Sequence, residues 1–388
     1  MATRVGLGKV GIADVELCFS QDNQGLVFDS REWDTKFVAH QMKLRVQHFR
    51  FVSRGTTIAG VTKKQLLDVP ITKPPLPEQR RIVAKIEKQF TRLDAGVAAL
   101  RRVQANLKRY RAAVLKAACE GRLVPTEAEL ARKERRTFET GEQLLQRILA
   151  DRRSKWKGRG KYSEPSGPIM PCYTAPSGWT FAAMRQAGEV QLGRQRAPQH
   201  HTGDHMRPYL RVANVFEARI DTADVMEMNF TPTEFEKYRL RFGDILLNEG
   251  QTPELVGRPA MFRDEVNDCC YQKTLIRFRA ADGVVPAYAL TVFRSHMHSG
   301  RFKKAASITT NIAHLTAEKF IEIEFPLPPL TEQKRIVVEV ERRLSVIDEL
   351  ESDVTANLAR ATRLRQSILQ QAFSGKSPST NGLHESPN

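Results

Sequence analysis

The sequence is poor in the features that mark secreted, metal-binding and membrane-spanning proteins. It has 5 cysteines in 388 residues, and no two of them, at positions 18, 119, 172, 269 and 270, have C-x-x-C spacing. We therefore expect reduced thiols, with neither a zinc site nor a disulfide framework. There is no run of about 18 apolar residues and no apolar signal-peptide core near Met1, so we expect a cytoplasmic protein without a membrane span.

Motifs that carry out catalysis are also missing. The sequence has no complete phosphate-binding loop, no glycine-rich cofactor loop after a strand, no Asn-Pro-Pro-Tyr methyltransferase site and no H-E-x-x-H motif. His200 and His201 lie in a loop-like stretch and are interpreted as surface residues, and we expect His296 and His298 to face solvent. The sequence therefore predicts that the chain is not an enzyme and holds no metal.

Positive charge is what the sequence has in excess. Its 61 lysines and arginines outnumber its 44 acidic residues and give a net charge of +17, whereas its hydrophobic share of 41% is ordinary for a globular protein. Such a charge attracts polyanions and favours nucleic acid as a partner. Because ribosome-associated and membrane-surface proteins can carry a similar excess, the charge alone does not decide the function.

A long internal repeat dominates the sequence. The segment that begins at Ser53 with SRGTTIAGVT matches the segment that begins at Ser307 with SITTNIAHLT, and the offset of 254 positions holds without a gap to the end of the similarity. Chance does not give so many identities at one offset. They include Thr56/Thr310, Ile58/Ile312, Ala59/Ala313, Thr62/Thr316, Pro74/Pro328, Pro75/Pro329, Leu76/Leu330, Glu78/Glu332, Gln79/Gln333, Arg81/Arg335, Ile82/Ile336, Val83/Val337, Asp94/Asp348, Arg111/Arg365 and Gly121/Gly375.

The first copy is expected to lack its beginning. Upstream of the repeat the copies correspond loosely, with Gln21 near the partner of Gln272 at an offset of 251. About 135 residues separate Cys172 from Ser307 in the second copy, but only 52 precede Ser53 in the first. The counterpart of roughly 172–249 is therefore expected to be missing. Three explanations are open: the start codon is misassigned, the gene is a fragment, or another chain completes the domain.

Each copy ends in a segment with helical periodicity, at 74–122 and 326–376. Apolar residues there recur at alternating spacings of three and four, which is typical of a coiled-coil seam. Gly121 and Gly375 stand where a C-terminal cap belongs. The expected packing residues are Ile86, Phe90, Leu93, Val97, Leu100, Leu107 and Val114 in the first copy, and Val340, Leu344, Ile347, Val354, Leu358 and Ile368 in the second.

We expect these two helices to pair with each other in antiparallel fashion within one chain, because their apolar stripes match in length. Two other arrangements remain open at this point. Each helix can pack on its own globular domain, or the helices can pair between two chains.

The remaining sections follow from composition. We expect a partial domain at 1–73, a helical segment and basic linker at 123–171, an α+β domain at 172–325 and a disordered tail at 377–388. The helical stretch is expected at 127–155, with an apolar stripe that includes Leu144, Leu145 and Ile148. The basic residues between Arg152 and Lys161 either touch DNA phosphate or belong to a solvated tether.

Side chains suited to base recognition are scattered through the globular regions. Arginine pairs with guanine, and asparagine or glutamine with adenine, through two hydrogen bonds in the major groove, while lysine suits phosphate. The candidates for DNA contact are Arg194, Arg196, Arg211, Asn214, Gln251, Arg258, Gln272, Lys273, Lys303, Lys304 and Asn311, together with Lys9 and Gln21 in the first copy. Asn214 can also serve a purely structural role by bonding to buried backbone.

The combination of these features resembles the specificity subunit of Type I restriction–modification enzymes. The family motif stands as PPLPEQRRIV at Pro74–Val83 and as PPLTEQKRIV at Pro328–Val337, each before a long helix. YLRVANVFEARI at Tyr209–Ile220, LRFGDILLNEG at Leu240–Gly250 and SGW at Ser177–Trp179 resemble pieces of its target recognition domain. The resemblance covers nearly the whole chain.

The resemblance implies an α+β fold with two pseudo-repeated target recognition domains, the first incomplete, separated by two long antiparallel coiled-coil helices. It implies a non-catalytic subunit in the cytoplasm of a prokaryote that reads a bipartite site on double-stranded DNA. Such a subunit docks two methyltransferase subunits, and restriction subunits are a further expected partner. S-adenosylmethionine, ATP and Mg²⁺ would act on those partners in methylation and phage defence, with none on this chain. The alternative is a fragment that serves only as a coiled-coil protein-binding scaffold.

Overall fold

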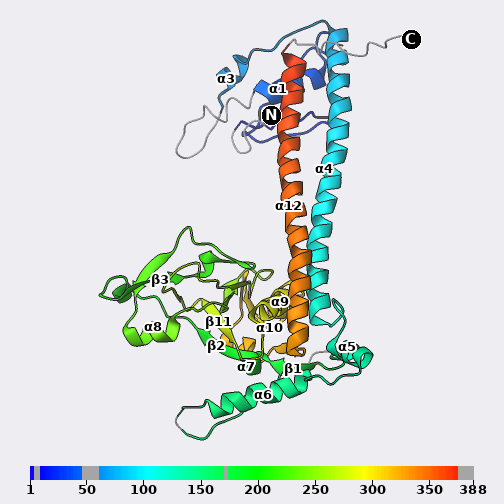
Figure 1. Ribbon diagram of the computed structural model, residues 1–388. Helices are drawn as coiled ribbons and strands as arrows, with labels where there is room; N and C mark the ends of the chain where they lie inside the picture. The colour runs from blue at the N-terminus through cyan, green and yellow to red at the C-terminus, as the bar shows by residue number, and fades with distance from the viewer. Residues whose placement is uncertain (4–8, 46–60, 159, 170–173, 375–388) are drawn as a thin grey trace, which may run out of the picture. The chain divides into compact units, whose positions relative to one another are not determined.

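The computed structural model describes residues 1–3, 9–45, 61–158, 160–169 and 174–374. The chain forms two compact units, one made of Met1–Asn106 with Leu350–Asn388 and the other of Leu107–Glu349. Two 44-residue helices, α4 (Leu76–Cys119) and α12 (Leu330–Phe373), contribute residues to both units (Figure 1). The tail at 377–388, Cys172 and the cap expected at Gly375 lie outside the described residues.

The named elements of the first unit, over its described residues, are all helices. It contains α1 (Thr35–Arg45), α3 (Lys63–Leu67), the first part of α4 and the last part of α12. Val38 and Met42 of α1 pack with Leu66 of α3 in one buried cluster. Thr62 caps α3, since its hydroxyl accepts from the backbone of Gln65.

The second unit combines helices with several small sheets, as expected for an α+β domain. The largest sheet has four strands in the order β2 (Gly188–Leu192), β11 (Leu275–Ala280), β7 (Ile245–Asn248) and β9 (Pro259–Met261). Two sheets have three strands each: β10 (Cys270–Tyr271), β3 (Met206–Leu210) and β6 (Met226–Asn229) form one, and β12 (Ser307–Thr309), β13 (Ile312–His314) and β8 (Gly250–Gln251) form the other. Two further pairs are β1 (Thr180–Ala183) with β14 (Glu324–Leu327), and β4 (Val215–Phe216) with β5 (Arg219–Ile220). Its shorter helices are α7 (Met184–Ala187), α8 (Pro232–Tyr238), α9 (Pro286–His298), α10 (Arg301–Ala305) and α11 (Ala317–Phe320), with 3-10 turns at Pro198–His200 and Val212–Asn214.

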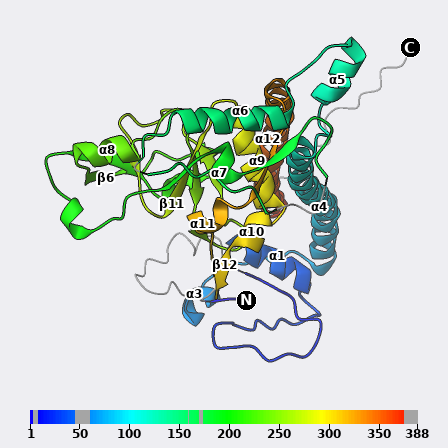
Figure 2. The ribbon, with the colours of Figure 1, turned by 90° about the horizontal axis from the view of Figure 1, so that it is seen from below.

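An aromatic core joins α9 to β11 of the four-stranded sheet in the second unit. Both elements are labelled in Figure 2. Phe293 of α9 lies edge-on to Phe278 of β11 at 4.9 Å between ring centroids, and Phe320 and Phe325 pack against the same rings. Most of α9 is buried, and this includes His296, whose Nε2 contacts Glu324 O at 3.0 Å. The expectation that His296 faces solvent was therefore wrong, because α9 is an interior helix rather than a surface helix.

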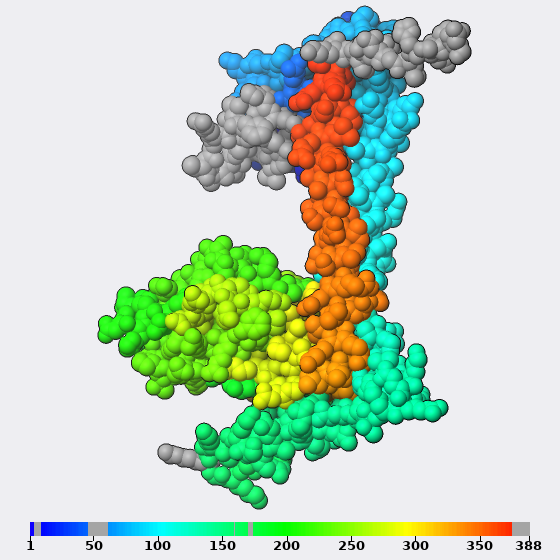
Figure 3. All heavy atoms as spheres, viewed as in Figure 1, coloured from blue at the N-terminus to red at the C-terminus, as the bar shows by residue number. Residues whose placement is uncertain are grey.

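Two helices, not one, fill the stretch at 127–155. They are α5 (Glu127–Glu134) and α6 (Gly141–Ser154), and each begins with its own threonine cap, Thr126 or Thr140. Arg135 ends α5 in the left-handed region, with φ 52°. Both helices lie in the second unit (Figure 3), where Leu144, Leu145 and Ile148 of α6 are buried.

The internal repeat is visible in the elements themselves. α4 and α12 have the same length, and they begin 254 positions apart at Leu76 and Leu330. α3 and α11 also begin 254 positions apart and follow the equivalent capping residues Thr62 and Thr316. α1 and α9 begin 251 positions apart, which is the offset that relates Gln21 to Gln272. The structure thus extends the repeat upstream of the segment in which sequence identity is clear.

The two long helices pair in antiparallel fashion in each unit. In the first unit, Ile86 and Phe90 of α4 pack against Ile368 and Leu369 of α12. In the second unit, Arg111 of α4 is paired with Asp348 of α12. Residue numbers rise along α4 while those of the contacting residues fall along α12, so the predicted antiparallel pairing within one chain is confirmed.

Candidate nucleic-acid interface

A buried glutamine fixes the start of each long helix to its own unit. Gln333 accepts a hydrogen bond from Val285 N (2.8 Å) through its side-chain oxygen and donates to Gly283 O and Pro328 O (both 3.1 Å) through its amide nitrogen. The side chain is fully buried, so these bonds satisfy groups that water does not reach.

Gln79 makes the equivalent three bonds in the first unit. Its oxygen accepts from Asp34 N (2.9 Å), and its amide donates to Glu32 O (3.0 Å) and Pro74 O (2.9 Å). It too is fully buried. The glutamine of the repeated PPLxEQ motif therefore has a physical role, which is to set the direction in which each helix leaves the globular residues before it.

The glutamate of the same motif has two different environments. Glu332 is fully buried and accepts from Glu127 N (2.8 Å) and Trp179 Nε1 (2.9 Å). Burial raises its pKa, although these donors favour the ionised form. Its repeat partner Glu78 is exposed and is paired with Arg81, at 3.2 Å on the same helix.

Two equivalent ion pairs flank the helix seam. Arg111 donates to Asp348 (2.6 Å) in the second unit, and Arg365 is paired with Asp94 in the first. The offset of 254 converts one pair into the other. Arg365 also lies over the ring of Phe90, 4.3 Å from its centroid. The polar interruptions of the seam at Arg111 and Arg365 are thus contacts between the two helices.

The residues expected in the helix seam are buried or half-buried in the structure. Ile347 is 1% exposed and Val114 2%. Ile86, Phe90, Leu107, Val340, Leu344, Val354 and Ile368 are also buried, and Leu93, Val97, Leu100 and Leu358 are half-buried.

Two candidates for base contact lie on one small sheet of the second unit. Gln251 of β8 is paired in register with Ala313 of β13, and Asn311 lies exposed in the turn between β12 and β13. Glu249, just before β8, donates its N–H to Thr274 O (3.0 Å), and this bond holds the turn that carries Gln272 and Lys273 beside the sheet. Gln251 and Asn311 therefore share one sheet, and Gln272 and Lys273 lie on a segment whose next residue is bonded to the residue two before Gln251.

Arg194 and Asn214 are structural residues, which corrects the expectation that they contact DNA. Arg194 is 7% exposed, is paired with Glu234 (2.8 Å) and donates to Asn229 O. Asn214 is 2% exposed, and its amide donates to Asp221 O and Asp224 O (both 2.9 Å). A base contact would require breaking these buried bonds, which is costly.

The other candidates lie nearer the surface. Arg211 is paired with Asp224, and Lys303 with Glu254 at 3.3 Å. Arg196 contacts His201 (3.1 Å), and Lys273 reaches Gln195 at 3.5 Å. Arg258 and Gln272 are half-buried, and Lys304, Lys9 and Gln21 are exposed.

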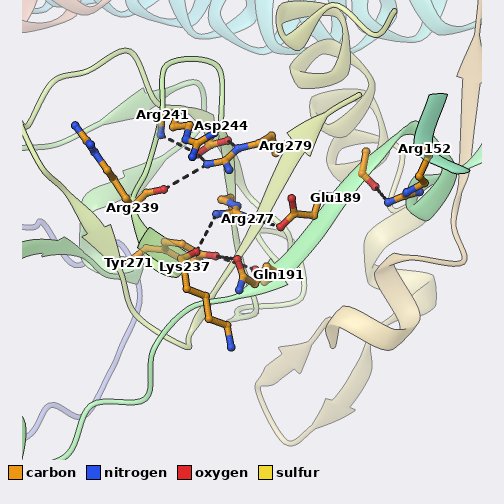
Figure 4. A network of polar contacts seen from close by, with 11 residues as sticks. Arg152, Glu189, Gln191, Lys237, Arg239, Arg241, Asp244, Tyr271, Arg277 and Arg279 are labelled. Carbon is orange, nitrogen blue, oxygen red and sulfur yellow. Dashed lines mark hydrogen bonds and ion pairs between the residues drawn. The ribbon is translucent and has the colours of Figure 1, made fainter. Parts of the chain in front are cut away.

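A buried charge network that the sequence analysis missed stabilises the four-stranded sheet (Figure 4). Arg277 of β11 is 1% exposed and donates to Glu189 (2.5 Å) and to Lys237 O (3.4 Å). Arg279 forms a two-bond pair with Asp244 (2.7 and 2.6 Å). The alternation of Arg277 and Arg279 with apolar residues along LIRFRA was the available signal. These arginines join the segment after α8 to the sheet, so part of the positive charge is structural.

Metal-binding clusters and membrane-spanning helices are both missing from the described residues. Nowhere among them do three or more His, Cys, Asp or Glu side chains gather in a way that would hold a metal ion. None of the helices in the described part of the chain combines the length and apolar character that a bilayer crossing requires.

Comparison with known families places this arrangement. The model of the Type I restriction modification DNA specificity domain matches residues 1–98 and 216–358, which is more than half of the chain and includes both PPLxEQ motifs. The chain belongs to this family. The resemblance inferred from Pro74–Val83 and Pro328–Val337 is therefore confirmed.

Curated members of the specificity-subunit family align over most of the chain. The specificity subunit of the Type I restriction enzyme EcoKI from Escherichia coli strain K12 is 25% identical over 346 residues, which are 88% of this chain and 65% of that subunit. The specificity subunit of EcoBI from Escherichia coli is 23% identical over 351 residues, 89% of this chain and 66% of that subunit. The chain thus spans just under two thirds of the length of these relatives.

A solved structure has a similar fold. One chain of a structure described as the basis of complex assembly and conformational transition of the type I R-M system aligns with a TM-score of 0.55 at 21% identity, and the match covers 88% of this chain and 71% of that one. The α+β class with long antiparallel helices, expected from the repeat, is confirmed by this likeness and by the sheets described above.

Proposed function

We propose that this chain is the non-catalytic subunit of a Type I restriction–modification complex that recognises a bipartite site on double-stranded DNA. The match of the DNA specificity family to both copies of the repeat carries the proposal. The net charge of +17 supports it, because a basic surface attracts the phosphate backbone. The cytoplasm of a prokaryotic cell is the compartment that this role implies.

In this proposal the two long helices serve as the separator between the two parts of the DNA site. A 44-residue helix has a rise of roughly 1.5 Å per residue and so extends over roughly 66 Å. One turn of B-DNA advances about 34 Å, so a bipartite site needs a separator on this scale. The buried seam and the two cross-helix ion pairs stiffen both ends of the pair.

Binding of the purified full chain to randomised DNA duplexes tests this function. If six to ten phosphates are contacted, affinity should fall about 10³- to 10⁵-fold between 50 and 200 mM salt. Rounds of selection from the same pool should enrich a sequence in two separated parts. Weak binding that changes little with salt, with no enriched sequence, would exclude the DNA-reading role.

Partner subunits are part of the proposal. Two methyltransferase subunits would dock through the helices and use S-adenosylmethionine to methylate adenine, and restriction subunits would use ATP and Mg²⁺ to move along and cut DNA. Mixing the chain with the methyltransferase subunit of the same system and measuring the mass of the complex tests the number of copies. Adenine methylation should require both proteins.

A second candidate is a scaffold that binds protein only through the helix pair. The exposure of Tyr110 and Leu364, which are equivalent positions in the two copies, favours a protein contact on these helices. This candidate predicts a stable complex with the methyltransferase subunit, but no enriched DNA sequence in the selection described above.

A further inference from the structure

Two arginines contact one aromatic ring in the second unit. Phe216 ends β4, and the guanidinium carbons of Arg219 and Arg258 each lie 4.7 Å from the centroid of its ring. Both distances are within the range of a cation–π contact. Because an aromatic face holds a planar guanidinium against it, the ring limits the orientations that each arginine can adopt.

The hairpin that carries Phe216 is fixed in place by the neighbouring residue, Glu217. Its carboxylate accepts from Arg294 Nε (2.9 Å) and contacts His298 Nε2 (2.9 Å), both on α9. Burial opposes ionisation of Glu217, but the hydrogen bond from His298 and the charge of Arg294 outweigh it and lower the pKa to about 2. The hairpin is also tied to β9, since Ala218 N donates to Pro259 O (2.8 Å).

Arg258 is a half-buried cation without an anionic partner. Among the described residues no hydrogen bond or ion pair of its side chain is found, and its Nε is buried and unsatisfied. Burial lowers the pKa of its guanidinium, and the nearby charge of Glu217 only partly offsets this effect. Glu217 is already bonded to Arg294 and His298. A desolvated cation without acceptors costs free energy in the unbound chain, as is common where a ligand supplies the acceptors.

We propose that Arg258, whose guanidinium lies over the ring of Phe216, is a specificity-determining residue that reads a guanine in the half-site recognised by the second unit. The proposal rests on the DNA-binding function argued above and names one residue and one base for it. Guanine presents two acceptors, O6 and N7, at the spacing of the guanidinium fork, which makes arginine its commonest reader in the major groove.

The environment of Arg258 favours a base over a phosphate. A phosphate contact needs charge rather than a fixed plane, and an exposed lysine or arginine supplies it. Arg219 fits that second role, because its side chain is 61% exposed and its one ion pair, with Asp221, is long at 3.5 Å. The two arginines on Phe216 therefore divide the task, with Arg258 reading the base and Arg219 holding the adjacent backbone.

Selection from randomised DNA duplexes with the full chain tests the assignment. The wild-type chain should enrich a bipartite sequence, and Arg258→Lys should lose the preference for one guanine, by roughly ten- to hundred-fold, while it keeps the rest of the sequence. Arg219→Ala should instead weaken binding to all sequences alike and reduce the salt slope by about one. Arg263→Ala, which removes an exposed arginine of the same unit, is the matched control and should leave the enriched sequence unchanged.

A modified base sharpens the test. In the duplex that the wild type selects, 7-deazaguanine at the assigned position removes the N7 acceptor, so wild-type binding should weaken while Arg258→Ala binding stays the same. Phe216→Leu, which removes the ring but not the fork, should reduce the preference for that guanine partially. Thermal unfolding of each variant checks that the chain folds.

Three results would overturn the inference. The first is an Arg258→Lys chain that still enriches every guanine of the wild-type sequence, and the second is an equal response of the wild-type and Arg258→Ala chains to the modified base; either result refutes the assignment of Arg258 alone. The third is a wild-type chain that enriches no sequence at all, in which case the DNA-reading function fails and the inference fails with it.

Discussion

Replacing Gln333 by methionine should destabilise the second unit through polar loss alone. Methionine has nearly the same length and volume as glutamine, so no large cavity is created. The substitution leaves Val285 N, Gly283 O and Pro328 O without the partners they now have at 2.8–3.1 Å. An unsatisfied buried group costs about 1–3 kcal/mol. Since carbonyls tolerate the loss better than an N–H, we expect about 2–4 kcal/mol in total.

The assay must report on the unit in which the change is made. A chain with two units is not expected to unfold in one step, so a single melting temperature is a blunt measure. For a unit of this size, the loss corresponds to a drop of roughly 5–15 °C in its own transition. Amide exchange is sharper, because the Val285 N–H bonds directly to the glutamine and should lose its protection in Gln333→Met.

Matched substitutions decide whether the bonds matter. Gln146→Met changes an exposed glutamine of the same unit and should alter stability by less than about 0.5 kcal/mol. Gln79→Met should lower protection of the Asp34 N–H and leave that of Val285 unchanged. If Gln333→Met behaves like Gln146→Met in both unfolding and exchange, the glutamine does not anchor the helix and the reasoning fails.

Three further outcomes follow from the helix pair and the Glu217 contacts. Reversing one charge of the Arg111–Asp348 pair should cost about 0.2–1 kcal/mol and the double reversal should restore most of it, as a double-mutant cycle in urea would measure. Ile347→Asp should cost more than about 3 kcal/mol and exceed Leu93→Asp, because Ile347 is 1% exposed and Leu93 is half-buried; equal losses in thermal unfolding would contradict the seam. The pKa of Glu217 is lowered to about 2, so the ionised carboxylate stabilises the fold above about pH 4.5 and this contribution is lost as the pH falls towards 2. The wild type should therefore exceed Glu217→Gln in stability by at most about 3 kcal/mol, and urea titrations should show this difference shrinking as the pH falls from 4.5 to 2.

The sequence predicted those parts of the fold that depend on periodic patterns. The heptad spacing gave the two long helices and their antiparallel pairing, and Gly121 ends α4 as expected, with φ 65° and a bond from Arg122 N to Ala117 O. Helix breaks that depend on one residue were not predicted, as at Arg135, because a non-glycine residue in the left-handed region has no reliable sequence signal.

The candidate site was predicted less well, because one residue type serves two purposes. Arg194, Arg258 and Arg277 are each arginines in basic, loop- or strand-like stretches, and nothing local separates them. The structure does so through long-range partners: Glu234 pairs with Arg194 from 40 residues away, and Glu189 pairs with Arg277 from 88 residues away. Arg258 has no such partner among the described residues. Sorting structural from recognising arginines therefore requires the tertiary contacts.

The repeat shows which physical constraints the two copies share. Gln79 and Gln333 keep all three bonds, including donation to a carbonyl two residues before the N–H that they accept from. Glu78 and Glu332 keep only their identity, because Trp179 and the start of α5 bury Glu332 while Glu78 stays exposed. The motif glutamine is thus maintained by a demand internal to each copy, whereas the environment of the glutamate depends on what packs over the helix start. Both copies thus anchor the helix through the glutamine, but only in the second copy do other residues pack over the helix start and bury the glutamate.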